Sequence, residues 1–369
     1  MNIARFPRLH AESEDFLHLD FLRIIAALGV VVFHWRASVT LPGPSDRWTF
    51  IDSLSSFVDM FFVISGFIIC HVYARRMGTA SAFLHFLRKR FARLAPLHYL
   101  TLAIYVAIGL AAPAAGIALS EPRKYDMACI VPNLLFAHSL GTCRDLSFNF
   151  PSWSISAEMA CYLLFPGVLW LVRIRAWLPA LFALIILTVL YALGPAGPLH
   201  RYWFEWTFEW SVWRALPAFA LGISFYSMRE QLAKLPAAAP MMFVMLIAYL
   251  PLAAAGAWHG LLTPMSYAIV ACGVAADAQR HTSQLVRTLA PLGQLTYSVY
   301  MLHALFVTVG FTLVFDRILH LPPTAKLVAV IACLPLLFGV AYLSLIFFEQ
   351  PARRWLSKPT VLRDTPSAV

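Results

Sequence analysis

The sequence predicts an all-α, polytopic membrane protein with about ten transmembrane helices and both termini in the cytoplasm, formed by one domain over residues 1–369. The first observation behind this fold class is composition: 60% of the residues are hydrophobic, 12% are charged, and the mean hydropathy is +0.73. Soluble domains contain about 45–50% apolar and about 25% charged residues. Polar side chains are too few here to cover a soluble core, so we expect a lipid bilayer around the chain.

The second observation is that the apolar residues fall in long runs with polar segments between them. Because one crossing takes about 20 residues, ten crossings use roughly 200 residues and leave the rest for loops. In chain order, the runs predict membrane helices near residues 20–39, 54–74, 95–117, 155–172, 177–194, 212–228, 239–256, 261–277, 293–315 and 327–348.

Four of the segments outside these helices have a distinct character. A short segment, 1–19, precedes the first helix, and its acidic and histidine residues do not fit a secretory signal, so we expect the first helix to remain in the mature protein. The inner loop 75–94 is rich in basic residues, the outer loop 118–154 is the longest, and a C-terminal tail covers 349–369.

The third observation is the distribution of basic residues, which sets the orientation. With the N-terminus inside, 18 of the 28 basic residues fall in inner segments and nine in outer segments. This bias places both termini in the cytoplasm. The net charge of +10 does not indicate nucleic acid, because the basic residues lie between apolar runs and form no single patch.

Arg23 and His34 are polar residues within the otherwise apolar first helix. Their separation corresponds to about three helical turns, so both side chains project from one face, roughly 16 Å apart along the axis. Such a face does not point at lipid. Either Arg23 extends to the inner interface and a neighbouring helix satisfies His34, or both line a cavity in which His34 accepts a proton.

The segment PSWSISAEMACYLLFP places Glu158 at the start of the fourth predicted helix. A carboxylate at this position caps the helix favourably, because the N-terminal end of the macrodipole is positive. Alternatively, Glu158 faces inward and orients a histidine or binds an acceptor hydroxyl. The spacing leaves both interpretations open.

The stretch FLRKRFARLAPLHYL carries Arg88, Lys89, Arg90 and Arg93 just before the third predicted helix. One interpretation is a positive anchor that contacts anionic lipid. The other is a clamp for a phosphate or pyrophosphate, because Arg90 and Arg93 at i and i+3 share a helix face and arginine binds phosphate in a bidentate way.

Two of the six cysteines, Cys129 and Cys143, lie in the outer loop. Their spacing permits a disulfide in an oxidising compartment but does not require one. The other four lie in apolar runs and are expected to be small buried hydrophobic residues: Cys70, Cys161, Cys272 and Cys333.

Several common chemistries have no motif in the chain. There is no Walker loop, GxGxxG fingerprint, HExxH, CxxC pair or GxSxG elbow. The sequence therefore indicates neither nucleotide hydrolysis nor a metal-dependent mechanism.

Six segments together resemble the acyltransferase-3 family of bacterial integral membrane acyltransferases that act on carbohydrates. The segments follow the family's order from the first helix to the C-terminus: LDFLRIIAALGVVVFH (19–34), FVDMFFVISGFII (57–69), FLRKRFARLAPLHY (86–99), PSWSISAEMACYLLFP (151–166), LGQLTYSVYMLHALF (292–306) and FEQPARRW (348–355).

The resemblance implies transfer of an acyl group from cytoplasmic acyl-CoA to a hydroxyl of a cell-surface, lipid-linked or exported carbohydrate. Acyl-CoA is then a donor substrate, and no permanently bound cofactor is implied. By position, Arg23 and His34 match the arginine and histidine of the first-helix motif, and Glu158 matches the acid of the SWSxxxE segment. Arg90 and Arg93 match the arginine pair associated with CoA, with Arg88 beside them.

The expected reaction is O-acylation, with acetyl as the expected acyl group, in the bacterial cytoplasmic (inner) membrane. His34 acts either as the general base toward the acceptor hydroxyl or as a covalent carrier of the acyl group. The expected partners are the acyl-CoA donor, the carbohydrate acceptor, membrane lipid and glycan-assembly proteins.

A different class of function uses the same polar residues as a path for transport. A secondary transporter or flippase for a lipid-linked sugar fits the composition, although paired repeats with broken helices are not visible in the sequence. A third interpretation is a structural membrane scaffold. Consumption of acyl-CoA separates an acyltransferase from both.

Overall fold

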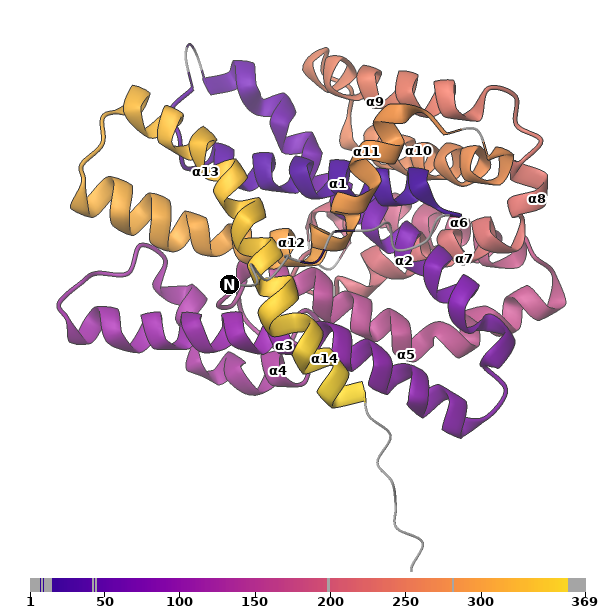
Figure 1. Cartoon of the computed structure of the whole chain (residues 1–369), viewed down its shortest axis with the longest axis horizontal. Coiled ribbons are helices and arrows are strands. Elements are labelled where there is room, and N and C mark those ends of the chain that lie inside the picture. The colour runs from indigo at the N-terminus through magenta and orange to yellow at the C-terminus, as the bar shows by residue number, and fades with distance from the viewer. Residues whose placement is uncertain are drawn as a thin grey trace, which may run out of the picture.

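The chain is helical throughout its described part. The computed structural model describes residues 7, 9, 15–41, 43, 45–197, 200–280 and 282–357, and these ranges contain helices, turns and loops without a strand (Figure 1). The predicted all-α class is confirmed. Most of the segment 1–19, and the C-terminal tail from residue 358 onward, lie outside the described residues.

The longer helices correspond one by one to the predicted membrane runs. They are α1 (Leu17–Arg36), α2 (Phe57–Tyr73), α3 (Ala80–Ala114), α5 (Trp153–Ile174), α6 (Leu178–Leu193), α7 (Val212–Ser227), α9 (Ala238–Ala254), α10 (His259–Gln279), α12 (Thr296–Leu305) with its continuation η9 (Phe306–Ile318), and α13 (Pro323–Ser344).

Shorter helices connect these elements. They are η1 (Ser45–Ser56), η2 (Ala74–Arg76), η3 (Pro122–Tyr125), η4 (Met127–Cys129), α4 (Ile130–Leu134), η5 (Phe150–Ser152), η6 (Gly194–Ala196), η7 (Trp203–Glu205), α8 (Arg229–Leu232), α11 (Gln284–Leu289), η8 (Ala290–Leu295), η10 (Leu345–Glu349) and α14 (Gln350–Ser357).

Eight helical stretches within the described residues are long and apolar enough to cross a membrane. The predicted runs 212–228 and 239–256 fall instead on α7 and α9, which have 16 and 17 residues. A crossing takes about 20 residues, so these two are short for a full span. The chain is a multi-pass membrane protein, and the number ten stays a prediction.

Two segments predicted to lie outside the membrane crossings are helical in the structure. The inner loop 75–94 is mostly helix, because α3 begins at Ala80 after Thr79, whose hydroxyl accepts the Ala82 amide at 3.2 Å and caps the helix. Good helix formers and no glycine follow from residue 82 to 95, so α3 continues without a break into the apolar run. The first part of the predicted C-terminal tail, 349–369, is likewise helical, because α14 extends the helix to Ser357.

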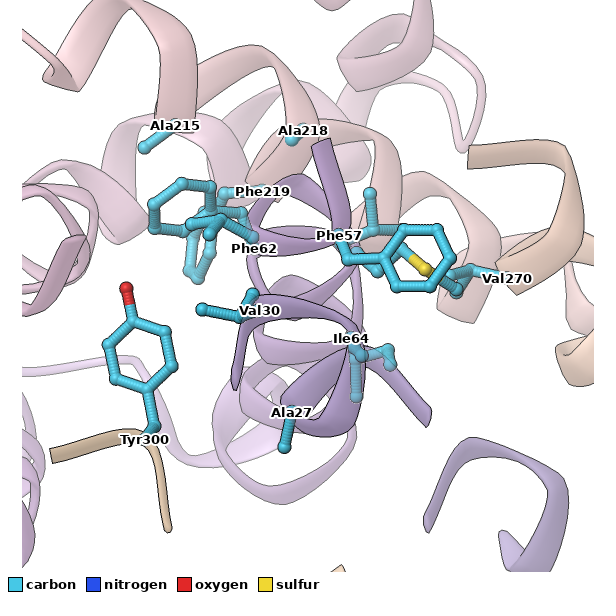
Figure 2. Close-up of a cluster of buried hydrophobic side chains, with 14 of the residues drawn as sticks. Ala27, Val30, Phe57, Phe62, Ile64, Ala215, Ala218, Phe219, Val270 and Tyr300 are labelled. Atoms are coloured by element: carbon cyan, nitrogen blue, oxygen red, sulfur yellow. The ribbon is translucent and has the colours of Figure 1, made fainter. Parts of the chain in front are cut away.

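The centre of the core is the contact between α2 and α7. Gly66 of α2 and Gly222 of α7 let the two backbones touch, since a Cβ on either would collide with a carbonyl of the other helix. Small residues at crossings allow such close packing of membrane helices. Figure 2 shows Phe57, Phe62 and Ile64 of α2 within this core, among side chains from α1, α7, α10 and α12.

Asp277, near the end of α10, fixes the start of α1. Its carboxylate accepts the amides of His18 and Leu19 at 2.9 and 3.2 Å and lies 2.7 Å from the His18 ring. The first amides of a helix have no partner within the helix, so this carboxylate satisfies two of them where the helix dipole is positive. It therefore positions the helix that carries Arg23 and His34.

Hydrogen bonds join neighbouring helix ends in the alternating arrangement that the sequence predicts. At one end of the molecule, Arg173 donates to the Met77 carbonyl at 2.8 Å. At the opposite end, Arg317 near the end of η9 donates to the Ala118 carbonyl, which follows α3, at 2.6 Å. The assignment of the first end to the cytoplasm stays a prediction.

Candidate active site

A cavity of about 460 Å³ lies between α1, α2, α3, α5, α12 and α14. Its volume is within the range of roughly 300–1,000 Å³ that small-molecule sites occupy. Four of the predicted site residues line it: Arg23, Arg90, Arg93 and Glu158. Arg353 of α14 lines it as well, so arginines from three helices line the same cavity as Glu158.

Arg90 and Arg93 both reach the cavity because α3 is already helical at these positions. Arg88 is not among the lining residues, and its Nε donates to the Leu356 carbonyl of α14 at 3.0 Å. Successive residues turn by about 100° around a helix, so residues 88 and 90 point to nearly opposite sides whereas 90 and 93 share a side. The structure thus brings together two of the three arginines predicted to bind the donor.

Glu158 lies in the second turn of α5, and its carboxylate accepts two hydroxyl hydrogen bonds. Tyr162 donates at 2.5 Å from the next turn, and Ser65 donates at 2.6 Å from α2. The first turn of α5 contains no acidic residue, so Glu158 does not cap the helix. The inward-facing alternative is the one the structure adopts, with hydroxyls in place of the expected histidine.

Arg23 faces the cavity from α1 with an acidic neighbour on the same helix. Its Nη1 donates to Asp20 at 3.2 Å, and both side chains are largely buried. This contact orients the guanidinium, so its charge is available to the cavity at a fixed position.

His34 lies beyond the cavity and does not line it. The half-buried ring of His34 packs edge-on against Phe150 at 4.7 Å between centroids and is stacked on His303 of α12 at 5.1 Å. Tyr300 stands between the two regions, because it lines the cavity and its ring lies 5.8 Å from that of His303. The Tyr300 hydroxyl is held by Ser154 at 2.7 Å.

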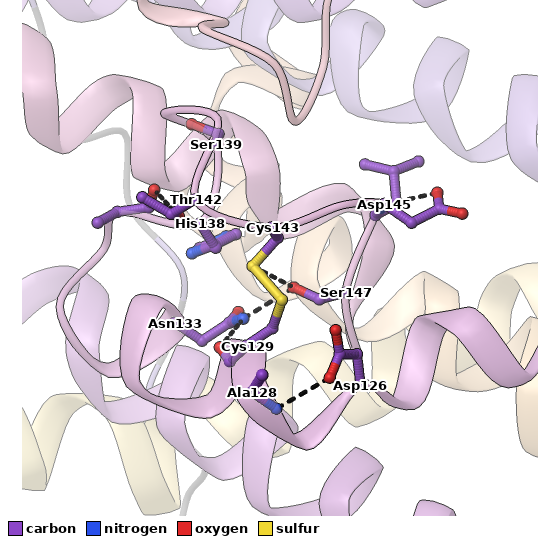
Figure 3. The surroundings of a disulfide bond; sticks show 12 residues. Asp126, Ala128, Cys129, Asn133, His138, Ser139, Thr142, Cys143, Asp145 and Ser147 are labelled. Atoms are coloured by element: carbon purple, nitrogen blue, oxygen red, sulfur yellow. Dashed lines mark hydrogen bonds between the residues drawn. A yellow bond between two sulfur atoms is a disulfide. The ribbon is translucent and has the colours of Figure 1, made fainter.

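The outer loop positions Phe150 against His34. Cys129 and Cys143 form a disulfide, which settles the alternative that their spacing left open (Figure 3). Asn133 donates to the Cys129 carbonyl and to Ser147, both at 2.8 Å, and so joins the two sides of the loop.

Asn149 then connects the end of this loop to the helices beneath it. Its amide donates to Thr101 of α3 at 3.1 Å and to the Met301 carbonyl of α12 at 3.0 Å. These bonds fix the backbone next to Phe150, so the loop holds the Phe150 ring in contact with His34.

A second pair of stacked histidines lies apart from the cavity. His98 and His138 are buried, with ring centroids 5.5 Å apart. Burial lowers the pKa of His138 to about 3, and the neighbouring His98 adds to this effect, so the His138 ring stays neutral at pH 7. Neither residue lines the cavity, and we regard this pair as structural.

A buried ion pair between α2 and α7 was not predicted from the sequence. Arg214 donates to both carboxylate oxygens of Asp59 at 3.1 and 2.7 Å, and both side chains are almost fully buried. Arg214 also lies over the Trp153 ring at 5.1 Å. The available signal was a charged residue at the start of the apolar run 212–228, where Arg214 lies.

Two further residues at or beyond the cavity were not predicted as site residues, although each left a trace in the sequence. Arg353 belongs to the FEQPARRW stretch, and its place on a helix that packs on α3 could not be seen without the fold. His303 interrupts the apolar run YMLHALF, which is the usual sign of an intramembrane polar group. Within the described residues, no group of three potential ligands for a metal ion occurs.

Comparison with known proteins gives one family match and two similar relatives. The acyltransferase-3 family model, described as "Acyltransferase domain", matches residues 16–347. Protein 2 in the picA locus of Rhizobium radiobacter is 33% identical over 161 residues, which are 40% of this chain and 78% of that protein. Acyltransferase MdmB of Streptomyces mycarofaciens is 31% identical over 167 residues, 40% of each chain, so less than half of MdmB is covered. No solved structure matches.

Proposed function

The chain belongs to the acyltransferase-3 family of membrane acyltransferases, and from this premise we propose that it transfers an acetyl group from cytoplasmic acetyl-CoA to a carbohydrate hydroxyl. The acceptor is a cell-surface, lipid-linked or exported glycan, and the protein acts in the bacterial inner membrane. The single observation that carries the proposal is the cavity that brings three arginine-bearing helices together one tyrosine away from His34.

The donor end of the reaction uses the cavity arginines. Arg90, Arg93 and Arg353 present guanidinium groups from α3 and α14 to one space, which suits the phosphates of CoA. Glu158 holds Tyr162 beneath Arg90 and partly balances the positive charge. Arg88 supports this end of the cavity by tying α3 to α14.

The pantetheine arm then extends along α1 from the arginines toward His34. Arg23 and His34 are separated by eleven residues, which is roughly 16 Å along a helix axis. An extended arm can cover part of this distance, and it must pass Tyr300 to reach the histidine. Arg23 lies beside the path, where its charge attracts the donor.

At His34, the imidazole accepts the proton of the acceptor hydroxyl while the hydroxyl oxygen attacks the thioester carbon. The carbon–sulfur bond then breaks, the electron pair leaves with sulfur, and His34 returns the proton to the thiolate. Such general-base assistance contributes typically about 10²–10⁴-fold to a rate. An acyl-His34 intermediate is the other course of the same overall transfer.

The test is release of free thiol from acetyl-CoA by the purified protein in lipid, with a crude extract of lipid-linked and exported glycans as the acceptor. We expect thiol release that depends on the extract and that disappears in folded His34→Ala. If the extract contains an acceptor that another acetyltransferase modifies, and neither acetyl-CoA nor longer acyl-CoA is consumed here, the proposal fails. A transporter or flippase for a lipid-linked sugar would give that result.

A further inference from the structure

His303 is stacked on the His34 ring in the aromatic cluster beyond the cavity. The two imidazoles are stacked with centroids 5.1 Å apart and planes inclined by 23°. The His303 side chain is fully buried, whereas His34 is half-buried. Phe150 packs edge-on against both rings, at 4.7 and 6.2 Å. The pair therefore shares one enclosed environment.

Neither ring nitrogen of His303 makes a well-aligned hydrogen bond among the described residues, and the backbone of Tyr300 and Val299 on the same helix supplies weaker polar contacts to the ring. A buried polar group without a well-aligned hydrogen-bond partner destabilises the fold. If the side chain at position 303 served packing alone, an apolar ring of the same size would stabilise the fold more than an imidazole does. A buried imidazole whose two nitrogens are poorly satisfied by the protein is suited to contact a polar group of a ligand.

The position of His303 relative to the cavity suggests which ligand this is. Tyr300 and His303 are three residues apart on α12 and therefore share a helix face. Tyr300 lines the cavity, and the His303 ring lies directly beyond it. A group that extends from the cavity past Tyr300 reaches His303 and His34 together.

We propose that His303 is a second catalytic histidine, which donates a ring N–H to the thioester carbonyl oxygen while His34 accepts the proton of the acceptor hydroxyl. This inference rests on the proposed acyl transfer. As the hydroxyl oxygen bonds to the thioester carbon, the carbonyl electron pair moves onto oxygen, and the His303 N–H stabilises that negative charge. The carbonyl re-forms when the carbon–sulfur bond breaks. His303 gives up no proton, and the proton that His34 accepts goes to the CoA sulfur.

The geometry of the pair fits this division of roles. In an attacking complex, the hydroxyl oxygen lies about 3–3.5 Å from the carbonyl carbon, so two imidazoles about 5 Å apart can each serve one of the two oxygens at about 2.7–3.1 Å. Two imidazoles this close do not both carry a charge, since like charges disfavour each other. When His34 takes the proton, His303 stays neutral and keeps one N–H to donate.

Two substitutions separate this role from packing. His303→Phe keeps a ring of similar shape against His34 but removes both nitrogens. His303→Gln loses the ring but keeps an N–H donor at a similar reach. With acetyl-CoA and the glycan extract, we expect His303→Phe to lower kcat by about 10²–10³-fold with little change in KM, and His303→Gln to stay within about tenfold of wild type.

The matched control is His98→Phe, which changes a buried histidine that is also stacked on another histidine but does not line the cavity. We expect its kcat to stay within about threefold of wild type, because this substitution changes packing away from the cavity and removes no group that contacts the reacting atoms. Melting curves in detergent establish that each variant is folded, and His303→Leu replaces His303→Phe if the latter unfolds.

Two results overturn the inference while leaving the proposed function intact. If wild type transfers acetyl groups and folded His303→Phe does so equally well, His303 serves packing alone. If folded His303→Gln is as inactive as His303→Phe, an N–H donor is not what the site needs. Failure of the proposed function is a different outcome, because wild type itself then consumes no acyl-CoA.

Discussion

The guanidinium carbon of Arg90 lies 5.4 Å from the centre of the Tyr162 ring, whose hydroxyl donates to Glu158 at 2.5 Å. This contact joins α3 to α5. It connects Arg90, which is predicted to bind CoA, to Glu158, the predicted acid of the site. An arginine over an aromatic face gains about 0.5–2 kcal/mol, depending on its hydration. Arg90 is thus held in place before any phosphate arrives, which reduces the entropy lost on binding.

A lysine substitution is expected to weaken acetyl-CoA binding at Arg90 and Arg93, which line the cavity, but not at Arg88. Lysine keeps the charge but not the bidentate geometry, so we expect Arg90→Lys and Arg93→Lys to raise the KM for acetyl-CoA by about 10-fold. Arg88→Lys is the matched control, because Arg88 binds the Leu356 carbonyl outside the cavity. Thiol-release kinetics measure all three. An equal rise in KM for Arg88→Lys would contradict the assignment of phosphate binding to the cavity.

Glu158 contributes a charge to the cavity as well as two accepted hydrogen bonds. Glu158→Gln can still accept the hydroxyls of Ser65 and Tyr162, so we expect its melting temperature to change little. Without the charge, the arginines repel one another more strongly and lose their fixed arrangement. We expect kcat/KM for acetyl-CoA to fall by about 10-fold. Unchanged kinetics would show that the carboxylate has only a structural role.

The Asp59–Arg214 pair makes a prediction about stability. Removing one partner of a buried ion pair leaves an uncompensated charge and typically costs about 3–5 kcal/mol. We therefore expect Asp59→Asn to lower the unfolding temperature in detergent by several degrees, and the double variant Asp59→Leu/Arg214→Met to recover most of this loss. If the double variant is less stable than Asp59→Asn, the arginine has a further role that its bonds to Ser55 and Trp206 would explain.

The orientation in the membrane is open to a direct test. Gly78 lies just before α3 on the end assigned to the cytoplasm, and Arg123 lies in the outer loop; both are exposed. In a Cys333→Ser background, an impermeant maleimide applied to intact cells is expected to label Arg123→Cys but not Gly78→Cys. Permeabilised cells should label both. The reverse pattern in intact cells would place the arginine cavity on the outside.

The positions of the helices could be predicted from the sequence because they depend on local properties. Apolar runs as long as a bilayer is thick determine where α1, α2 and α13 lie. The start of α3 was missed for the same reason, since a basic, helix-forming stretch is not apolar and looks like a loop. The spacing placed Arg90 and Arg93 on one helix face, and by the same helical geometry Arg88 points to another side.

The site was predictable in part. Arg23, Arg90, Arg93 and Glu158 were identifiable as polar groups in or beside apolar runs, and the structure gathers them around one cavity. The His34–His303 stack and the Asp59–Arg214 pair could not be predicted, because partners far apart in the chain meet only through the packing of whole helices. Asp59 and Arg214, for example, are 155 residues apart.

The central claim is that an acetyl group moves from CoA to a carbohydrate through His34. The most direct measurement is mass-spectrometric detection of isotope-labelled acetyl on the glycan extract after incubation with labelled acetyl-CoA, for wild type and for His34→Ala with an unchanged melting curve. We expect label on the carbohydrate with wild type and none above background with His34→Ala. Equal labelling by both proteins would contradict the role of His34, and no labelling by wild type with an extract proven to accept acetyl groups would contradict the transfer itself.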